Sequence, residues 1–129
     1  MELSAAIHLI KKGIQESNEP QRWADLGAGD GLFTRALGSV LPVNSTIVAI
    51  DQNASSLKSI DWNFKSVSLQ IISGNFVSIS WGEGFDGILM ANALHYVNAQ
   101  VNFLSKLKTK VSQTGRLVII CSEIGRAHV

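Results

Sequence analysis

The sequence predicts an α/β fold in which a doubly wound, mainly parallel sheet of about five strands carries helices on both faces. Short apolar runs alternate along the chain with segments whose apolar residues recur at three- and four-residue steps, the period of an amphipathic helix. The connections between successive apolar runs are too long for hairpins, which indicates βαβ units. The run at residues 46–50 is β-branched and lacks polar alternation, as expected for a strand that is buried on both faces of a parallel sheet.

The individual elements follow from these patterns. The predicted strands are residues 22–26, 46–50, 67–72, 85–91 and 116–122. The predicted helices are residues 3–15, residues 32–41 closed by Pro42, a helix from Asn53 or Ser55 to about Asn63, and a helix capped by Asn98 that carries Val101, Leu104, Leu107 and Val111. On the exposed side of this last helix, Lys106, Lys108 and Lys110 are expected to form a solvated face.

Composition excludes several classes of protein. With 129 residues, 46% of them hydrophobic and 16% charged, and a net charge of +1, the chain predicts one globular domain without a basic field for nucleic acid. Its apolar runs are too short to span a membrane and its start lacks the pattern of a signal peptide, so a cytoplasmic protein is expected. The single cysteine, Cys121, rules out an internal disulfide and a cysteine-based zinc site, and we expect it to be an inert buried thiol. His8, His95 and His128 are scattered, and no metal site is predicted.

Polar and small residues follow several of the predicted strands directly. Because the carboxyl ends of parallel strands meet at one edge of the sheet, these residues are expected to cluster there, at the switch point between the first and fourth strands. They are Asp25, Gly27, Asp51, Asn75, Ala91 and Asn92.

The loop after the first strand carries glycines at alternate positions, Gly27, Gly29 and Gly31, before a helix begins. Such a loop lets a ligand approach the backbone and the free N–H groups of the helix start. A dinucleotide fingerprint needs glycines at i, i+2 and i+5, and here Leu32 stands where the last one is required. Asp51, at the end of the second strand, can accept from the two hydroxyls of a ribose; a helix N-cap or a surface acid is the alternative.

These motifs resemble those of the class I S-adenosylmethionine-dependent methyltransferases. DLGAGDG at residues 25–31 is similar to the family's glycine motif, and AID at residues 49–51 to its second motif. FDGILMANALHYV at residues 85–97 is similar to the fourth strand and its following loop, and QTGRL at residues 113–117 to the turn before strand five. The resemblance runs from about Trp23 to Ser122 and implies a Rossmann-like fold with S-adenosylmethionine as cofactor.

The resemblance also implies roles for individual residues. The glycine loop would pass beside the methionine portion and the ribose, Asp51 would accept from the ribose hydroxyls, and Asn75 and Phe76 would flank the adenine. Many relatives carry an aspartate where this chain has Asn75. The predicted cofactor-binding residues are Asp25, Gly27, Ala28, Gly29, Asp30, Gly31, Asp51, Gln52, Asn75, Phe76, Ala91 and Asn92.

Methyl transfer from a sulfonium is an in-line displacement in which the protein chiefly aligns donor and acceptor. His95 is the one candidate base near the expected mouth of the site, and a packing or capping histidine is the alternative. The implied function is methyl transfer to a small molecule, which the weakly charged surroundings at Leu94, Tyr96 and Trp81 favour. An RNA or protein acceptor stays open, as do the oligomeric state, a non-catalytic binding module and, less favoured, an NAD-dependent oxidoreductase.

The class I sheet has more strands than the sequence predicts here. We therefore expect residues 1–122 to form a cofactor-binding domain that is incomplete at its C-terminus, with an apolar edge prone to association along strand five. Residues 123–129 resemble a translated sequencing adapter and are expected to be a non-native tail, with a short native tail as the alternative.

Overall fold

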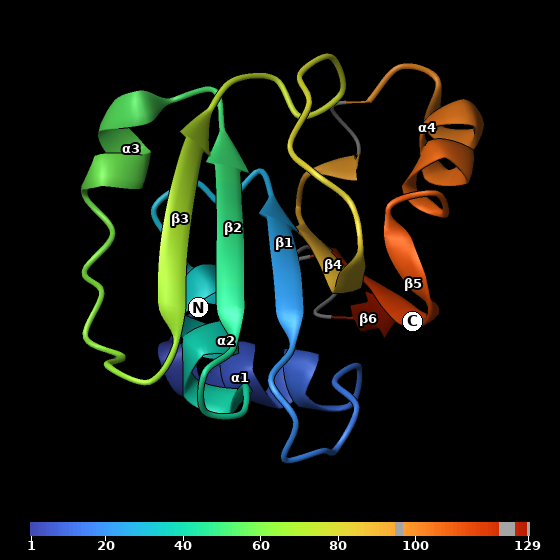
Figure 1. Cartoon of the computed structure of the whole chain (residues 1–129). Coiled ribbons are helices and arrows are strands. Elements are labelled where there is room, and N and C mark those ends of the chain that lie inside the picture. The colour runs from blue at the N-terminus through green and yellow to red at the C-terminus, as the bar shows by residue number, and fades with distance from the viewer. Residues whose placement is uncertain (95–96, 122–125, 129) are drawn as a thin grey trace.

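The computed structural model describes residues 1–94, 97–121 and 126–128, the last three by their backbone alone. A single sheet carries the strand order β3-β2-β1-β4-β5-β6 in these residues (Figure 1). The strands are β1 (Arg22–Leu26), β2 (Thr46–Asp51), β3 (Ser68–Ser73), β4 (Phe85–Ala91), β5 (Val111–Cys121) and β6 (Arg126–His128). The helices are α1 (Leu3–Lys11), α2 (Leu32–Val40), α3 (Ala54–Lys58) and α4 (Gln100–Leu107).

Strands β1 to β5 pair with one another in parallel, which confirms the predicted fold class. β1 lies between β2 and β4, so the chain reverses its direction of travel across the sheet at this pair of strands. The predicted switch point between the first and fourth strands is therefore confirmed, and it places the loop after β1 beside the loop after β4.

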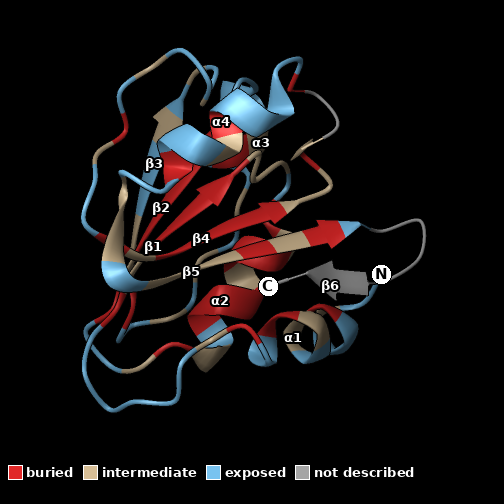
Figure 2. Cartoon of the chain, turned by 90° about the vertical axis from the view of Figure 1, so that its right-hand side faces the viewer, coloured by how far each residue is buried: buried red, intermediate tan, exposed pale blue. Residues whose placement is uncertain are grey.

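Two apolar cores flank the sheet because side chains alternate between its faces. In β1, Trp23 enters one core and Ala24 the other, and both are almost fully buried. α1 and α2 cover the first face with side chains such as Ile10 and Leu37, and α4 covers the second with Phe103 (Figure 2). The absence of polar alternation in the predicted central strands follows from this double burial.

The helices are shorter than the sequence predicts. α1 ends at Lys11 instead of residue 15, because the chain turns at Gly13, where an added Cβ would lie 2.4 Å from a methyl group of Val118. α3 ends at Lys58 instead of about Asn63, since Trp62 turns inward and its Nε1 donates to the Val67 carbonyl at 2.9 Å. Tertiary packing decides both helix ends.

The end of the chain also departs from prediction. β5 begins at Val111, a position expected on the preceding helix, and its pairing with β4 is irregular between Phe85 and Gly87. β6 is a strand that the sequence pattern does not predict; it pairs antiparallel with the last residues of β5. The expected tail at residues 123–129 lies partly outside the described residues.

Two side chains next to β5, Cys121 and Lys110, have surroundings that differ from those predicted. Cys121 is exposed and not a buried thiol, because strand alternation turns it to the face opposite Ile120 at the end of β5. Lys110 does not belong to a solvated face: its Nζ lies 4.8 Å from the centroid of the Trp81 ring and 3.4 Å from the Gly82 carbonyl. Lys106 and Lys108 are exposed, as expected. In the described part of the chain, no helix is both long and apolar enough to cross a bilayer.

Candidate cofactor site

The glycine loop is fixed to the end of the neighbouring strand β2. The N–H groups of Gly27 and Ala28 both donate to the Ile50 carbonyl, at 2.8 and 3.0 Å. Gly27 has a φ of 76°, and a Cβ added to it would lie 2.8 Å from the Cβ of Ala93 in the loop after β4. Glycine is therefore needed here for both backbone conformation and close approach, and the loops after β1 and β4 are brought together as predicted.

Asp51 links this loop to the end of β2 through its carboxylate. Its Oδ2 accepts from the N–H of Gly29 at 2.9 Å, and its Oδ1 accepts from the N–H of Asn53 at 2.8 Å. The cap of α3 is Asn53, whose side chain accepts from Ser56, so the N-cap alternative for Asp51 is wrong. A carboxylate has about four acceptor sites, so each oxygen of Asp51 can accept one more hydrogen bond.

Asp25 is the buried acid of the site, with 1% of its surface exposed. The Thr34 hydroxyl, from the first turn of α2, donates to Oδ2 of Asp25 at 2.6 Å. Burial raises the pKa of Asp25 to about 6, and the nearby Asp51 carboxylate adds to the rise while the Thr34 bond opposes it. The carboxyl is thus mainly ionised at neutral pH, and at little cost it can take up a proton near pH 6.

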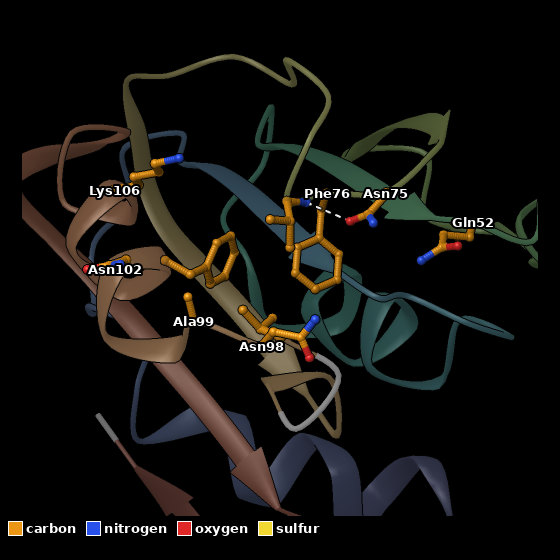
Figure 3. A pocket seen from close by; sticks show the side chains of 10 residues that line it. Gln52, Asn75, Phe76, Asn98, Ala99, Asn102 and Lys106 are labelled. Carbon is orange, nitrogen blue, oxygen red and sulfur yellow. Dashed lines mark hydrogen bonds between the residues drawn. The ribbon is translucent and has the colours of Figure 1, made fainter.

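The predicted site residues divide between two cavities at the carboxyl edge of the sheet. The first has a volume of about 250 Å³ and lies against the glycine loop. Of the predicted residues it is lined by Asp25, Gly27, Ala28, Gly29, Asp30, Ala91 and Asn92. The second has a volume of about 300 Å³ and is lined by Gln52, Asn75 and Phe76 together with side chains of α4 and the loop before it (Figure 3).

Two predicted residues line neither cavity. Gly31 is buried at the start of α2, and a Cβ added there would lie 2.6 Å from the Ile60 side chain, so its glycine serves packing. Asp51 stands beside the loop, bonded to Gly29. Gly29 differs from Gly31, since a Cβ added to Gly29 would meet no heavy atom within 4 Å, which leaves space over the loop beside the first cavity.

The far end of β3 positions the residues predicted at the adenine. Oδ1 of Asn75 accepts from the N–H of Val77 at 2.9 Å. The ring of Phe76 lies 5.5 Å from that of Phe103 on α4, and the Phe76 carbonyl accepts from Nε1 of Trp81 at 2.9 Å. Trp81 is 4% exposed, so it belongs to the core and does not form part of an acceptor surface, contrary to expectation.

The contribution of α4 to the second cavity was not predicted. Asn98, Asn102 and Lys106 line it, as do Val97, Ala99 and Phe103. Asn102 and Lys106 are four residues apart on α4 and therefore share one side of it, and this spacing is the sequence signal for their position. Asn98 precedes the helix, whose N-cap is Ala99 without a side-chain hydrogen bond, so the predicted cap at Asn98 is wrong.

No histidine of the described part of the chain lines either cavity. His95 lies outside the described residues, as does Tyr96. His8 is exposed on α1. Within the described ranges, no three or more His, Cys, Asp or Glu side chains are grouped so that they could hold a metal ion.

Comparison with known proteins places this geometry in a family. The pattern of the methyltransferase domain family matches residues 24–119, from β1 into β5. A search of curated proteins found no match.

Several solved structures share the fold. Coclaurine N-methyltransferase bound to N-methylheliamine and SAH is 18% identical with a TM-score of 0.75; the match covers 91% of this chain and 35% of that one. The plantazolicin methyltransferase in complex with a monoazolic desmethyl analogue and SAH is 19% identical with a TM-score of 0.71, covering 91% and 45%. A SAM-dependent methyltransferase from Aquifex aeolicus is 20% identical with a TM-score of 0.71, covering 88% and 62%.

The chain thus spans between 35% and 62% of the length of these three proteins. At such identities the structures show the fold, while the family match covers most of the chain. The chain belongs to the class I S-adenosylmethionine-dependent methyltransferases, the family whose motifs its glycine loop and Asp51 resemble.

Proposed function

We propose that this chain binds S-adenosylmethionine across the two cavities and takes part in methyl transfer to a small molecule. The observation that carries the proposal is the position of Asp51. The Asp51 carboxylate accepts a hydrogen bond from the N–H of Gly29, in the loop beside the first cavity. Gln52, the next residue in the chain, lines the second cavity. A cofactor with a ribose between two chemically different ends suits this arrangement, because each Asp51 oxygen can accept one further bond from a hydroxyl.

The two cavities suit the two ends of the cofactor. The first contains the buried Asp25 and also Asp30, and carboxylates favour the cationic sulfonium and ammonium groups of the methionine portion. The second offers the Phe76 ring and amide side chains to a planar base. When bound, the cofactor supplies an electrophilic methyl group on sulfur, and the residues of this chain bind and orient it.

A small acceptor is supported by the chemistry of the chain and by its structural relatives. A net charge of +1 provides no broad basic field for RNA. Coclaurine N-methyltransferase was solved with N-methylheliamine, a small molecule, and its fold covers nearly all of this chain. The family match gives no support to an oxidoreductase.

Calorimetric titration with S-adenosylhomocysteine and NAD tests the cofactor. We expect S-adenosylhomocysteine to bind and NAD not to bind. Asp51→Asn should weaken S-adenosylhomocysteine by about tenfold or more, since hydrogen bonds to a charged group contribute about 1.5–3 kcal/mol. Asp61→Asn, at an exposed position in the connection from α3 to β3, is the matched control and should bind like the wild type. Binding of NAD alone would refute the proposal.

Methyl transfer is tested separately by following S-adenosylhomocysteine formation in the presence of small amines and phenols, total RNA, or a peptide library. Product formation only with small molecules is the expected result. Transfer to RNA or peptide would replace the proposed acceptor class. Tight cofactor binding without transfer to any acceptor would instead support the non-catalytic module.

A further inference from the structure

The carboxyl group of Asp25 is buried at the edge of the first cavity, whose described lining contains no cation. Only 1% of the Asp25 surface is exposed, yet the residue lines the cavity together with the glycine loop and the end of β4. Its described hydrogen-bond donor is the neutral hydroxyl of Thr34. The charged residues in the described lining are Asp25 and Asp30, and none is a Lys, Arg or His.

The elements packed around Asp25 do not neutralise its charge either. β2 ends in Asp51, a second carboxylate, and β4 places the apolar Leu89 beside Asp25 in the sheet. α2 carries one charged residue, Arg35. Burial, the Thr34 bond and the Asp51 charge set the pKa of Asp25, and no cation is among these causes. A cation that enters the cavity is therefore attracted by a carboxylate whose charge has no other partner.

The position of Asp51 directs the sulfur of a bound cofactor to this cavity. One methylene group joins the sulfur of S-adenosylmethionine to its ribose. The N–H of Gly29 donates to the Asp51 carboxylate, and Gly29 lines the first cavity, as does Asp25. A ribose held by Asp51 thus brings the sulfur to the cavity that contains Asp25.

We propose that Asp25 is the specificity-determining residue that distinguishes the charged sulfonium cofactor from its neutral thioether product. This inference rests on the proposed function, since it takes the first cavity to hold the sulfur end of the cofactor. An ionised Asp25 attracts the sulfonium, whereas the thioether of S-adenosylhomocysteine has no charge on sulfur. Methyl transfer removes that charge, so the reaction ends the attraction and favours product release. The ammonium group is common to both molecules and cancels in the comparison.

The test is a ratio of dissociation constants, that of S-adenosylhomocysteine divided by that of S-adenosylmethionine, from calorimetric titration of the whole chain at pH 7.5. We expect Asp25→Asn to lower this ratio by about tenfold or more, because a buried charge is only weakly screened. A ratio within about threefold of the wild-type value would overturn the inference, since Asp25 would then act equally on both ligands. If the wild type binds neither ligand, the proposed function fails and the inference with it.

A cofactor analogue separates the charge of the sulfonium from contact with its methyl group. In this analogue, a carbon atom that bears an ammonium group replaces the methylsulfonium. We expect Asp25→Asn to weaken the analogue as it weakens S-adenosylmethionine, because both carry a positive charge at this position. Weakening no greater than that of S-adenosylhomocysteine would show that Asp25 responds to the methyl group, and would refute the inference.

Asp30→Asn is the matched control, because it removes the same charge from the same cavity at an exposed position. We expect it to change the ratio by less than about threefold, since solvent screens an exposed charge. A change as large as in Asp25→Asn would show a general effect of charge and contradict the specific role of Asp25. A thermal melt followed by circular dichroism verifies that each variant remains folded.

The wild type provides an independent measurement through pH. Burial raises the pKa of Asp25 to about 6, so the carboxyl is largely ionised at pH 7.5 and largely protonated at pH 5. We expect the ratio to fall from pH 7.5 to pH 5 in the wild type and to stay constant in Asp25→Asn. Histidine also titrates in this range and His95 lies outside the described residues, so His95→Gln is measured alongside and should follow the wild type. A wild-type ratio that does not change with pH would contradict the inference, whether or not the variants fold.

Discussion

At the scale of single residues, Asp25 is the position where stability and the proposed function oppose each other. Its carboxyl is buried and has a single described hydrogen-bond donor, Thr34. The folded state holds the Asp25 proton up to about pH 6, whereas the unfolded chain releases it near 3.8. Between these values the folded state binds more protons, so the free energy of unfolding contributed by Asp25 falls as pH rises and stays lower above pH 6.

Asp25→Asn should remove this dependence. In urea titrations at pH 4, 5, 6 and 7.5, we expect the wild type to lose stability relative to Asp25→Asn across the series, by about 2–3 kcal/mol in total. The variant should also bind S-adenosylhomocysteine more weakly than the wild type at pH 7.5, because the first cavity loses a carboxylate. A constant stability difference between the two proteins from pH 4 to 7.5 would contradict the elevated pKa.

Sequence patterns identify such residues only in part. Asp25 and Asp51 are predictable because an acid at the end of a buried strand must lie at the ligand edge of a parallel sheet. The hydrogen-bond partner of Asp25 is harder to predict from the sequence, because Thr34 lies on the next helix and its contact with Asp25 depends on how α2 packs. The amide orientation of Asn75 depends on a local turn that no spacing rule reveals.

At the scale of elements, the glycines of the loop after β1 serve two purposes, close packing and open space beside a cavity, and the sequence alone does not show which glycine serves which. Gly29 and Gly31 both have positive φ, 58° and 92°, but their surroundings differ. An alanine methyl at Gly31 would overlap the Ile60 side chain, whereas one at Gly29 would enter open space beside the first cavity.

Paired alanine variants separate these roles. Gly31→Ala should lower the free energy of unfolding by about 2–4 kcal/mol, from backbone strain and overlap together. Gly29→Ala should cost about 1 kcal/mol in stability but weaken S-adenosylhomocysteine binding, because the methyl occupies space over the loop. Urea denaturation and calorimetry measure the two effects. Equal losses of stability in both variants would show that the contact with Ile60 has no consequence.

Element boundaries show where prediction from sequence stops. The start of each of the first four strands is predictable to within one residue, because apolar runs and the Gly, Asn or Asp that follow them are local signals. The ends of α1 and α3 are not predictable in this way, since Gly13 packs against Val118, which is distant in the sequence, and Trp62 bonds to Val67, which lies beyond the helix. β6 pairs antiparallel with β5, but a strand of so few residues has no sequence pattern that predicts this pairing.

At the scale of the whole molecule, the strand order concentrates the candidate site at one edge of the sheet. Asp25, Asp51, Asn75 and Ala91 lie at or just after the ends of four different strands, which β1 and its neighbours bring side by side. The opposite edge has its own polar cavity of about 180 Å³, lined in part by Gln15, Glu19, Asp86 and Arg116. A ligand that binds only at the carboxyl edge should therefore protect the backbone amides of that edge from hydrogen exchange and leave those of the opposite edge unprotected.

Hydrogen exchange measured by mass spectrometry should reveal that footprint. With S-adenosylhomocysteine at about 100 times its dissociation constant, amides that exchange only through opening of the ligand site should slow by up to about 100-fold. We expect slowing in peptides that cover residues 25–31 and 51–53, where the N–H groups of Gly29 and Asn53 are bonded to Asp51. The exposed connection at residues 15–20 is the internal control and should exchange at its unliganded rate, because it opens locally at the other edge. Protection of residues 15–20 without protection of the glycine loop would move the ligand to the opposite cavity and overturn the site.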